Sequence, residues 1–182
     1  TERAMRGEIE FEAALRERVG KLEGLALSAL QRTFDERVRL NPGAATLVRT
    51  MAAHGARCVL VSGGFTFFTS RVAAAAGFHA HRANVLLDDG AALTGVVRQP
   101  ILGRAAKLEA LKAEAANLSA PLDEALAIGD GANDLDMIKA AGLGIAYRAK
   151  PIVAAQAHAR IEHTSLEAAL FFQGYRRGEF AA

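Results

Sequence analysis

The sequence predicts an α/β fold built on a sheet of parallel strands, with a small helical cap in front of it. Short apolar runs bounded by turn residues alternate with longer amphipathic stretches, which is typical of strands that alternate with helices. Two of the runs end in polar, glycine-rich clusters, Ser62-Gly63-Gly64 and Gly129-Asp130-Gly131. Residues before Asn41 show only a helical pattern. We therefore expect a helical cap over residues 1–40 and the α/β core over residues 41–182.

The leader is expected to be helical over residues 2–38, because apolar residues recur at steps of three and four from Phe11 to Leu22 with charges between them. Asn41-Pro42-Gly43 ends this pattern. A further helix is expected over residues 44–54. Because the leader begins in mid-pattern and without an initiator methionine, we expect that part of a longer chain precedes it.

The core is expected to hold strands, a hairpin and helices in alternation. Apolar runs at 57–64, 125–129 and 143–147 are bounded by turn residues, which suits strands buried on both faces. A hairpin is expected over 84–97, because Asp89-Gly90 is a strong turn signal between two apolar runs. Helices are expected at 66–76, 104–117, 135–141, 152–157 and 166–173.

The composition is that of a globular protein and excludes several classes. The chain has 182 residues, of which 51% are hydrophobic and 23% charged, so a disordered tail is excluded. The net charge of +2 indicates no bias towards nucleic acid or membrane surfaces. The single Cys58 excludes an intrachain disulfide and a cysteine-rich zinc site. It favours a reducing compartment. With no secretory signal and no apolar stretch of membrane-spanning length, we expect a cytoplasmic protein.

Both glycine-rich clusters follow predicted parallel strands, so we expect them at the same edge of the sheet, where α/β folds bind ligands. The hydroxyl of Ser62 and the backbone N–H groups of the following glycines suit a phosphate oxygen, as does the N-terminus of the next helix. The alternative is that this cluster only turns the chain from strand to helix.

The acidic cluster offers a metal site or a helix cap. If a helix begins near Gly131, Asp130 occupies its N-cap and Asp134 lies one turn further on. Two glycines around one acid, followed by Asn133 and Asp134, exceed what a cap needs. Carboxylate oxygens are the ligands that Mg²⁺ prefers, usually one or two of them with phosphate oxygens and water. On helical spacing Asp136 faces away from Asp130, and we expect it to be a surface acid.

Two cations are candidates for binding negative charge. Lys107 lies on the helix over 104–117, where it either belongs to a solvated face or neutralises a phosphoryl group. Arg18 lies in the leader. It either forms a surface ion pair with Glu12 or Glu17, or it binds a substrate carboxylate through two parallel hydrogen bonds (a bidentate contact).

The stretches VLVSGGF (59–65), GRAAKLEAL (103–111) and AIGDGANDLDMIKAAGLGIAY (127–147) resemble, in order and spacing, the haloacid dehalogenase superfamily of phosphatases. With the leader RAMRGEIEFEAALRERV (3–19), the chain is similar to the phosphoserine-specific branch of that superfamily over nearly its whole length. The resemblance implies a Rossmann-like parallel sheet with helices on both faces and a small helical cap. It also implies Mg²⁺-dependent hydrolysis of O-phosphoserine to L-serine, through an aspartyl-phosphate, in serine biosynthesis. The expected partner is a small phosphomonoester, with a homodimer as a possible assembly.

The resemblance implies a role for each matching core residue. Ser62, helped by the backbone of Gly63, would bind the phosphoryl oxygens. Lys107 would neutralise the phosphate and the nucleophile. Asp130 would bind Mg²⁺ directly. Asp134 would support the metal through water.

Three further residues are implied to surround the substrate. Asn133 would make a polar contact beside the acidic cluster. In the cap, Arg18 would bind the serine carboxylate and Met5 would flank the substrate. Such a cap closes over the site and excludes water.

One motif of the superfamily is absent from this sequence. The Asp-x-Asp-x-Thr that supplies the nucleophile, the general acid/base and a metal ligand does not occur, and the Asp134-Leu135-Asp136 stretch is no substitute. An acid at the start of the cap that would bind the substrate amine is missing too. We expect that an N-terminal segment was lost, so that this chain alone is inactive. The alternatives are a phosphatase for another small phosphomonoester and a non-catalytic phosphate- or metal-binding module.

Overall fold

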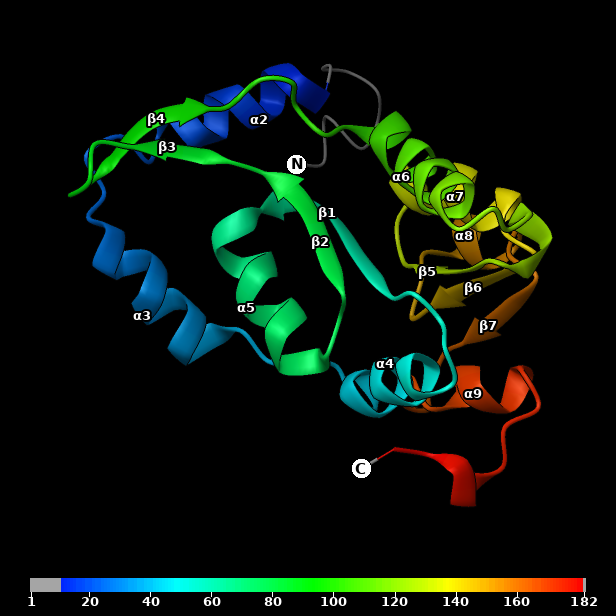
Figure 1. Ribbon diagram of the computed structural model, residues 1–182. Coiled ribbons are helices and arrows are strands. Elements are labelled where there is room, and N and C mark those ends of the chain that lie inside the picture. The colour runs from blue at the N-terminus through cyan, green and yellow to red at the C-terminus, as the bar shows by residue number, and fades with distance from the viewer. Residues whose placement is uncertain (1–10, 182) are drawn as a thin grey trace.

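A computed structural model describes residues 11–181, in which the parallel strands form two sheets (Figure 1). Strand β1 (Val59–Phe65) pairs with β2 (Ala80–Asn84), and β5 (Leu126–Gly129), β6 (Leu143–Tyr147) and β7 (Ala159–Ile161) pair in that order. The predicted α/β class with parallel strands is confirmed. Within the described residues, β1 and β5 each keep one edge without a strand partner.

The helices of the core follow the predicted pattern closely. Their bounds are α4 Ala44–Ala53, α5 Thr66–Ala76, α6 Arg104–Asn117, α7 Leu135–Ala140, α8 Pro151–Ala154 and α9 Ala168–Phe172, with short 3₁₀ turns at Leu122–Glu124, Ala132–Asp134 and Arg177–Glu179. Helices α8 and α9 are shorter than predicted, and strands β2 and β7 were not predicted. No helix in the described part of the chain combines the length and the apolar character needed to cross a membrane.

The leader is not one helix as predicted but two, α2 (Phe11–Gly20) and α3 (Leu27–Arg37). The chain breaks between them at Gly24, whose φ of +76° favours glycine. The N–H of Gly24 donates to the carbonyl of Leu93 at 2.9 Å. Pairing with another part of the chain therefore overrides the helical pattern here. The predicted helical residues 2–10 lie outside the described residues.

The segment that pairs with this break is the predicted hairpin, which is confirmed as antiparallel strands β3 (Leu86–Asp88) and β4 (Leu93–Val97). At its turn the Asp89 carboxylate accepts the N–H groups of Ala92 and Ala91 at 2.8 and 2.9 Å, and these bonds hold the pKa of Asp89 below its usual range. The hairpin packs against helix α2 (Figure 1).

The sheet β5–β6–β7 is covered on both faces, as expected for parallel strands. Ile145 and Tyr147 pack against α4 and α9, whereas Ala146 between them packs against Ile138 of α7 and Val153 of α8. Figure 1 shows α7 and α8 on one side of this sheet and α9 on the other. Strand β1 differs, because all its residues are only partly buried among the described residues.

Helix α6 joins the two sheets. At its far end the Glu114 carboxylate accepts hydrogen bonds from Arg57, which precedes β1, at 2.6 Å and from Arg82 of β2 at 2.7 Å. The guanidinium of Arg57 and then that of Arg82 hold the pKa of Glu114 below its usual range. These contacts fix α6 against the β1–β2 sheet, and its first turns then lie close to α7.

Candidate active site

Ser62 lies in the middle of β1, which continues through the two glycines, and its hydroxyl stabilises the irregular part of the strand where the pairing with β2 is interrupted between Val61 and Phe65. Its Oγ accepts the N–H of Gly64 at 3.0 Å. This bond uses a lone pair of the hydroxyl, and the O–H hydrogen has no acceptor within the part of the chain that the structure describes. Ser62 and Gly63 are half-buried, and α5 begins at Thr66. This part of β1 is therefore able to donate hydrogen bonds to an anion.

The acidic cluster at the end of β5 is organised by Asp134 rather than by Asp130. Asp134 is 2% exposed, and its Oδ2 accepts the N–H groups of Asp130 at 3.1 Å and Gly131 at 3.0 Å. The N-cap is Gly131, so the expected N-cap position of Asp130 is wrong. A Cβ on Gly129 would overlap the Asp134 side chain, which explains why a glycine stands there.

Lys107 donates a hydrogen bond from Nζ to Oδ1 of Asp134. The Lys107 side chain is 13% exposed and that of Asp134 only 3%, so Lys107 does not belong to a solvated face. A buried carboxylate with a lysine and two backbone donors is a fully satisfied anion. The pair fixes the lysine ammonium next to the end of β5.

A second ion pair holds the same two helices together. The Arg104 guanidinium donates to both oxygens of Asp136, at 2.8 and 2.6 Å. Arg104 lowers the pKa of Asp136, and the carboxylate in turn raises the pKa of Arg104. Asp136 is a partly exposed acid on α7 that binds α6, and its contacts with Arg104 orient the turn that carries Lys107.

Asn84, the last residue of β2, links the part of β1 around Ser62 to the segment that leads into α6. This residue was not selected from the sequence. Its Nδ2 donates to the carbonyl of Gly63 at 3.0 Å, and its Oδ1 accepts the N–H of Leu102 at 2.7 Å. Within the described residues, no hydrogen bond joins Ser62 directly to Lys107 or to Asp130.

Of the predicted cap residues, Arg18 is exposed on α2 and donates from Nε to the carbonyl of Ala14 at 3.2 Å. The ion pairs found on this helix join Arg16 to Glu12 and Lys21 to Glu17, so the alternative pairing of Arg18 with these acids is wrong. The apolar side of α2 packs near Phe65, the last residue of β1. Met5 lies outside the described residues.

The described residues supply some, but not all, of the oxygen ligands that a hard cation such as Mg²⁺ would need. Within the described residues the Asp130 carboxylate is exposed and has no hydrogen-bond or ion-pair partner. Asp134 is already bound to Lys107 and to two N–H groups. The neighbouring Asn133 is exposed. No group of three His, Cys, Asp or Glu side chains suited to a metal occurs among residues 11–181. Asp130 is therefore the available oxygen ligand.

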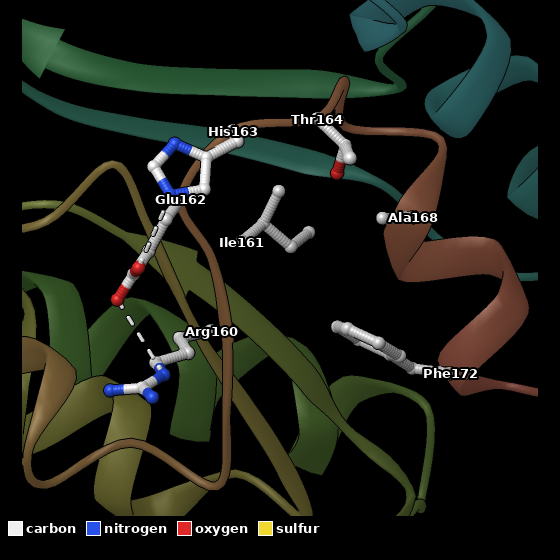
Figure 2. A pocket seen from close by; sticks show the side chains of 7 residues that line it. All are labelled: Arg160, Ile161, Glu162, His163, Thr164, Ala168 and Phe172. Atoms are coloured by element: carbon white, nitrogen blue, oxygen red, sulfur yellow. Dashed lines mark ion pairs between the residues drawn. The ribbon is translucent and has the colours of Figure 1, made fainter.

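A pocket of about 260 Å³ lies elsewhere, between the end of β7 and α9 (Figure 2). Ile161 and Phe172 line it, and on its rim the Glu162 carboxylate lies 3.5 Å from Arg160 and 3.7 Å from His163. None of the residues selected from the sequence lines this pocket, so it is distinct from the cluster around Asp134.

Comparison with known proteins gives consistent matches. The sequence model of the haloacid dehalogenase-like hydrolases matches residues 2–139. The chain is 44% identical to a phosphoserine phosphatase of Streptomyces coelicolor over all its 182 residues, but it spans only 44% of the length of that protein. It is 44% identical to a phosphoserine phosphatase of Albidiferax ferrireducens, over 92% of this chain and 73% of that protein.

Solved structures show the same similarity. A phosphoserine phosphatase described as a phospho-aspartyl intermediate analogue superposes with a TM-score of 0.85 at 34% identity, over 94% of this chain and 81% of the other.

Proposed function

We propose that this chain, which belongs to the haloacid dehalogenase-like hydrolase family, forms the phosphate-binding part of a phosphoserine phosphatase. The proposed reaction is the hydrolysis of O-phosphoserine to L-serine and phosphate. The observation that carries the proposal is the Asp130 carboxylate, which has no partner among residues 11–181 and lies beside the buried Lys107–Asp134 pair. The similarity to phosphoserine phosphatases over the whole chain supports the choice of substrate.

Phosphoryl transfer depends mainly on positioning and on neutralising charge, and the described residues offer both. Ser62 donates its O–H to one phosphoryl oxygen, and the backbone N–H of Gly63 donates to another. Lys107 places a positive charge between the phosphoryl group and the acidic cluster, because Asp134 holds its ammonium there. The buried position of this ion pair limits screening by water.

Mg²⁺ is the proposed metal, and its place is at Asp130. A hard cation takes carboxylate oxygens together with phosphate oxygens and water. Asp130 would bind the ion directly, Asp134 would support it through water, and Asn133 would make a polar contact with the substrate beside the acidic cluster. When bound, Mg²⁺ supplies positive charge to the phosphoryl oxygens. Asp134 also keeps the backbone of Asp130 in place through the N–H bonds described above.

The nucleophile is proposed to come from outside the 182 residues, because no Asp-x-Asp-x-Thr occurs in them. The edges of β1 and β5 that have no strand partner among the described residues support a strand that carries it at this point of the fold. An aspartate oxygen attacks phosphorus, the bond from phosphorus to the serine oxygen breaks, and that oxygen takes a proton from the general acid of the same motif, which regains a proton from the water that attacks next. Water then attacks the phosphorus of the aspartyl-phosphate, which releases phosphate and restores the aspartate.

We infer that the leader caps the substrate, with residues 1–40 as the cap and residues 41–182 as the core. Arg18 would bind the substrate carboxylate, because its guanidinium has only one hydrogen bond within the described residues. Met5 would flank the substrate. Packing of α2 beside Phe65 supports a position of this helix over the end of β1, the strand that carries Ser62.

The first experiment measures phosphate release from O-phosphoserine by the longest natural form of the protein, with Mg²⁺ and with EDTA. We expect release that stops with EDTA and that is lost in Asp130→Asn. Release that ignores EDTA would contradict the role of Asp130. The absence of any release, with binding of phosphate retained, would favour a non-catalytic binding module.

The second experiment tests the substrate with Arg18→Ala. We expect kcat/KM for O-phosphoserine to fall about 100-fold, and that for a phosphate ester without a carboxylate to change little. Arg16→Ala is the matched control, because Arg16 is on the same helix, is exposed and pairs with Glu12 at 2.8 Å. Equal losses on both esters would assign the enzyme to another phosphomonoester.

A further inference from the structure

Asn84 is a buried polar residue whose side-chain amide makes hydrogen bonds through both its NH₂ donor and its carbonyl acceptor. It is 2% exposed, at the carboxyl end of β2, where its partner in the ladder is Phe65 of β1. Burying an amide is costly unless its donors and acceptors are paired. Asn84 donates to Gly63 and accepts from Leu102. An apolar side chain at this place would leave the Gly63 carbonyl and the Leu102 N–H without these partners, so the amide ties two backbone segments together.

On the donor side, Asn84 fixes one peptide unit together with Ser62. The carbonyl of Gly63 accepts from Nδ2 of Asn84, and the N–H of Gly64 donates to Oγ of Ser62. These two groups belong to the same planar peptide, so it is held at both ends. With the peptide fixed, one lone pair of Oγ is always engaged and the O–H of Ser62 is left to donate elsewhere.

On the acceptor side, Asn84 fixes the approach to helix α6. Its Oδ1 accepts the N–H of Leu102 at 2.7 Å, two residues before α6 begins at Arg104. Lys107 lies in the first turns of that helix and binds Asp134. One side chain therefore ties the hydroxyl donor of β1 to the segment that leads to the lysine.

We propose that Asn84 is a positioning residue that sets the hydroxyl of Ser62 and the ammonium of Lys107 in register for the same phosphoryl group. This inference rests on the proposed phosphatase function. Asn84 does not contact the substrate, and it acts through the Gly63–Gly64 peptide and through Leu102.

The test is a double-mutant cycle with Ser62, measured on O-phosphoserine with Mg²⁺ in the longest natural form of the protein. Asn84→Asp keeps the acceptor for Leu102 but replaces the donor to Gly63 by an oxygen. We expect it to lower kcat/KM about 100-fold. In a Ser62→Ala background the same substitution is expected to cost less than about threefold, because its effect passes through Ser62.

The matched control is Thr50→Val. Thr50 is fully buried on α4, and its Oγ1 accepts the N–H of Ala181 at 2.8 Å, so the variant also loses one buried hydrogen bond. We expect it to lower the midpoint of thermal unfolding and to leave kcat/KM within about twofold at a temperature where it is folded. Equal factors for Asn84→Asp in both Ser62 backgrounds would overturn the proposal.

Amide hydrogen exchange separates this proposal from the function on which it rests. In Asn84→Asp we expect faster exchange at Gly64 and retained protection at Leu102, and in Asn84→Ala faster exchange at both. If the unsubstituted protein releases no phosphate from O-phosphoserine, the proposed function fails. The amide exchange rates still test whether Asn84 holds the Gly63–Gly64 peptide and Leu102 in place. Unchanged exchange at Gly64 in both variants would overturn the positioning role.

Discussion

Replacing Lys107 by methionine is expected to destabilise the fold strongly, even in the absence of substrate and metal. The substitution leaves the Asp134 carboxylate, 3% exposed, without its only cationic partner among the described residues. Breaking a buried pair from one side costs about 3–5 kcal/mol. Because two backbone N–H groups still bind Asp134, we expect the lower end, about 3 kcal/mol.

The measurement is urea unfolding followed by circular dichroism. With a slope of about 2 kcal/mol per molar urea, the loss corresponds to a midpoint lowered by about 1.5 M. Lys112→Met is the matched control, because Lys112 lies on the same helix, is 50% exposed and pairs with Glu109 at 3.1 Å. We expect Lys112→Met to lower the free energy of unfolding by less than about 1 kcal/mol. Equal midpoints for the two variants would refute the reasoning.

Three further substitutions probe other features. Glu114→Gln should lower the free energy of unfolding by about 1 kcal/mol at pH 7. Two arginines lower the pKa of Glu114 in the folded state. The stabilisation by the Glu114 carboxylate is therefore present above the ordinary carboxyl pKa of about 4.3 and is lost as the pH falls through the lowered pKa. Thermal unfolding of the variant and of the unsubstituted protein at pH 7 and pH 3 checks this. An equal difference in stability between the two proteins at both pH values would contradict it. Tyr147→Phe should raise stability by about 1 kcal/mol in urea unfolding, because the buried Tyr147 hydroxyl has no partner within the described residues; a loss would show that the hydroxyl is satisfied. Gly129→Ala should cost about 2 kcal/mol, because its Cβ would overlap the Asp134 side chain; an unchanged urea midpoint would rule out this crowding.

Elements with strong local signals were predictable from the sequence. The helices at 66–76 and 104–117 have the predicted bounds, and the hairpin turns at Asp89-Gly90 as expected. Membership of the haloacid dehalogenase superfamily is confirmed by the family match to residues 2–139. The break at Gly24 was not predictable in the same way, since pairing with the distant Leu93 decides it.

The candidate site was predictable in its residue types but not in its contacts. Order along the chain selected Ser62, Lys107 and Asp130, and their roles remain predictions. Spacing on a helix does not tell which lysine is buried, so only the structure shows that Lys107 binds Asp134. Asn84 was missed because the sequence assigned it to the start of the hairpin. Had β2 been recognised, a polar residue at its carboxyl end would have been a candidate.

The two strands that escaped prediction, β2 and β7, share a local cause. Each begins directly after a histidine, His79 or His158. The histidine makes a reciprocal pair of hydrogen bonds with one residue, which is Cys58 directly before β1 in one case and Gly144 of β6 in the other. His79 donates its N–H to the carbonyl of Cys58 at 2.9 Å, and its Nδ1 accepts the Cys58 N–H at 3.0 Å. His158 makes the same pair with Gly144, both bonds being 2.9 Å long.

A backbone N–H can only donate, so both Nδ1 atoms are acceptors, and each imidazole takes the place of a backbone carbonyl in the ladder. The pair of hydrogen bonds that precedes β2 and β7 is therefore half backbone and half side chain, and it needs no apolar residue at that position. Since β7 has only three residues and β2 five, little of either strand is left to show an alternating apolar pattern. Hydrophobic periodicity fails here because hydrogen bonding rather than burial determines where these strands begin.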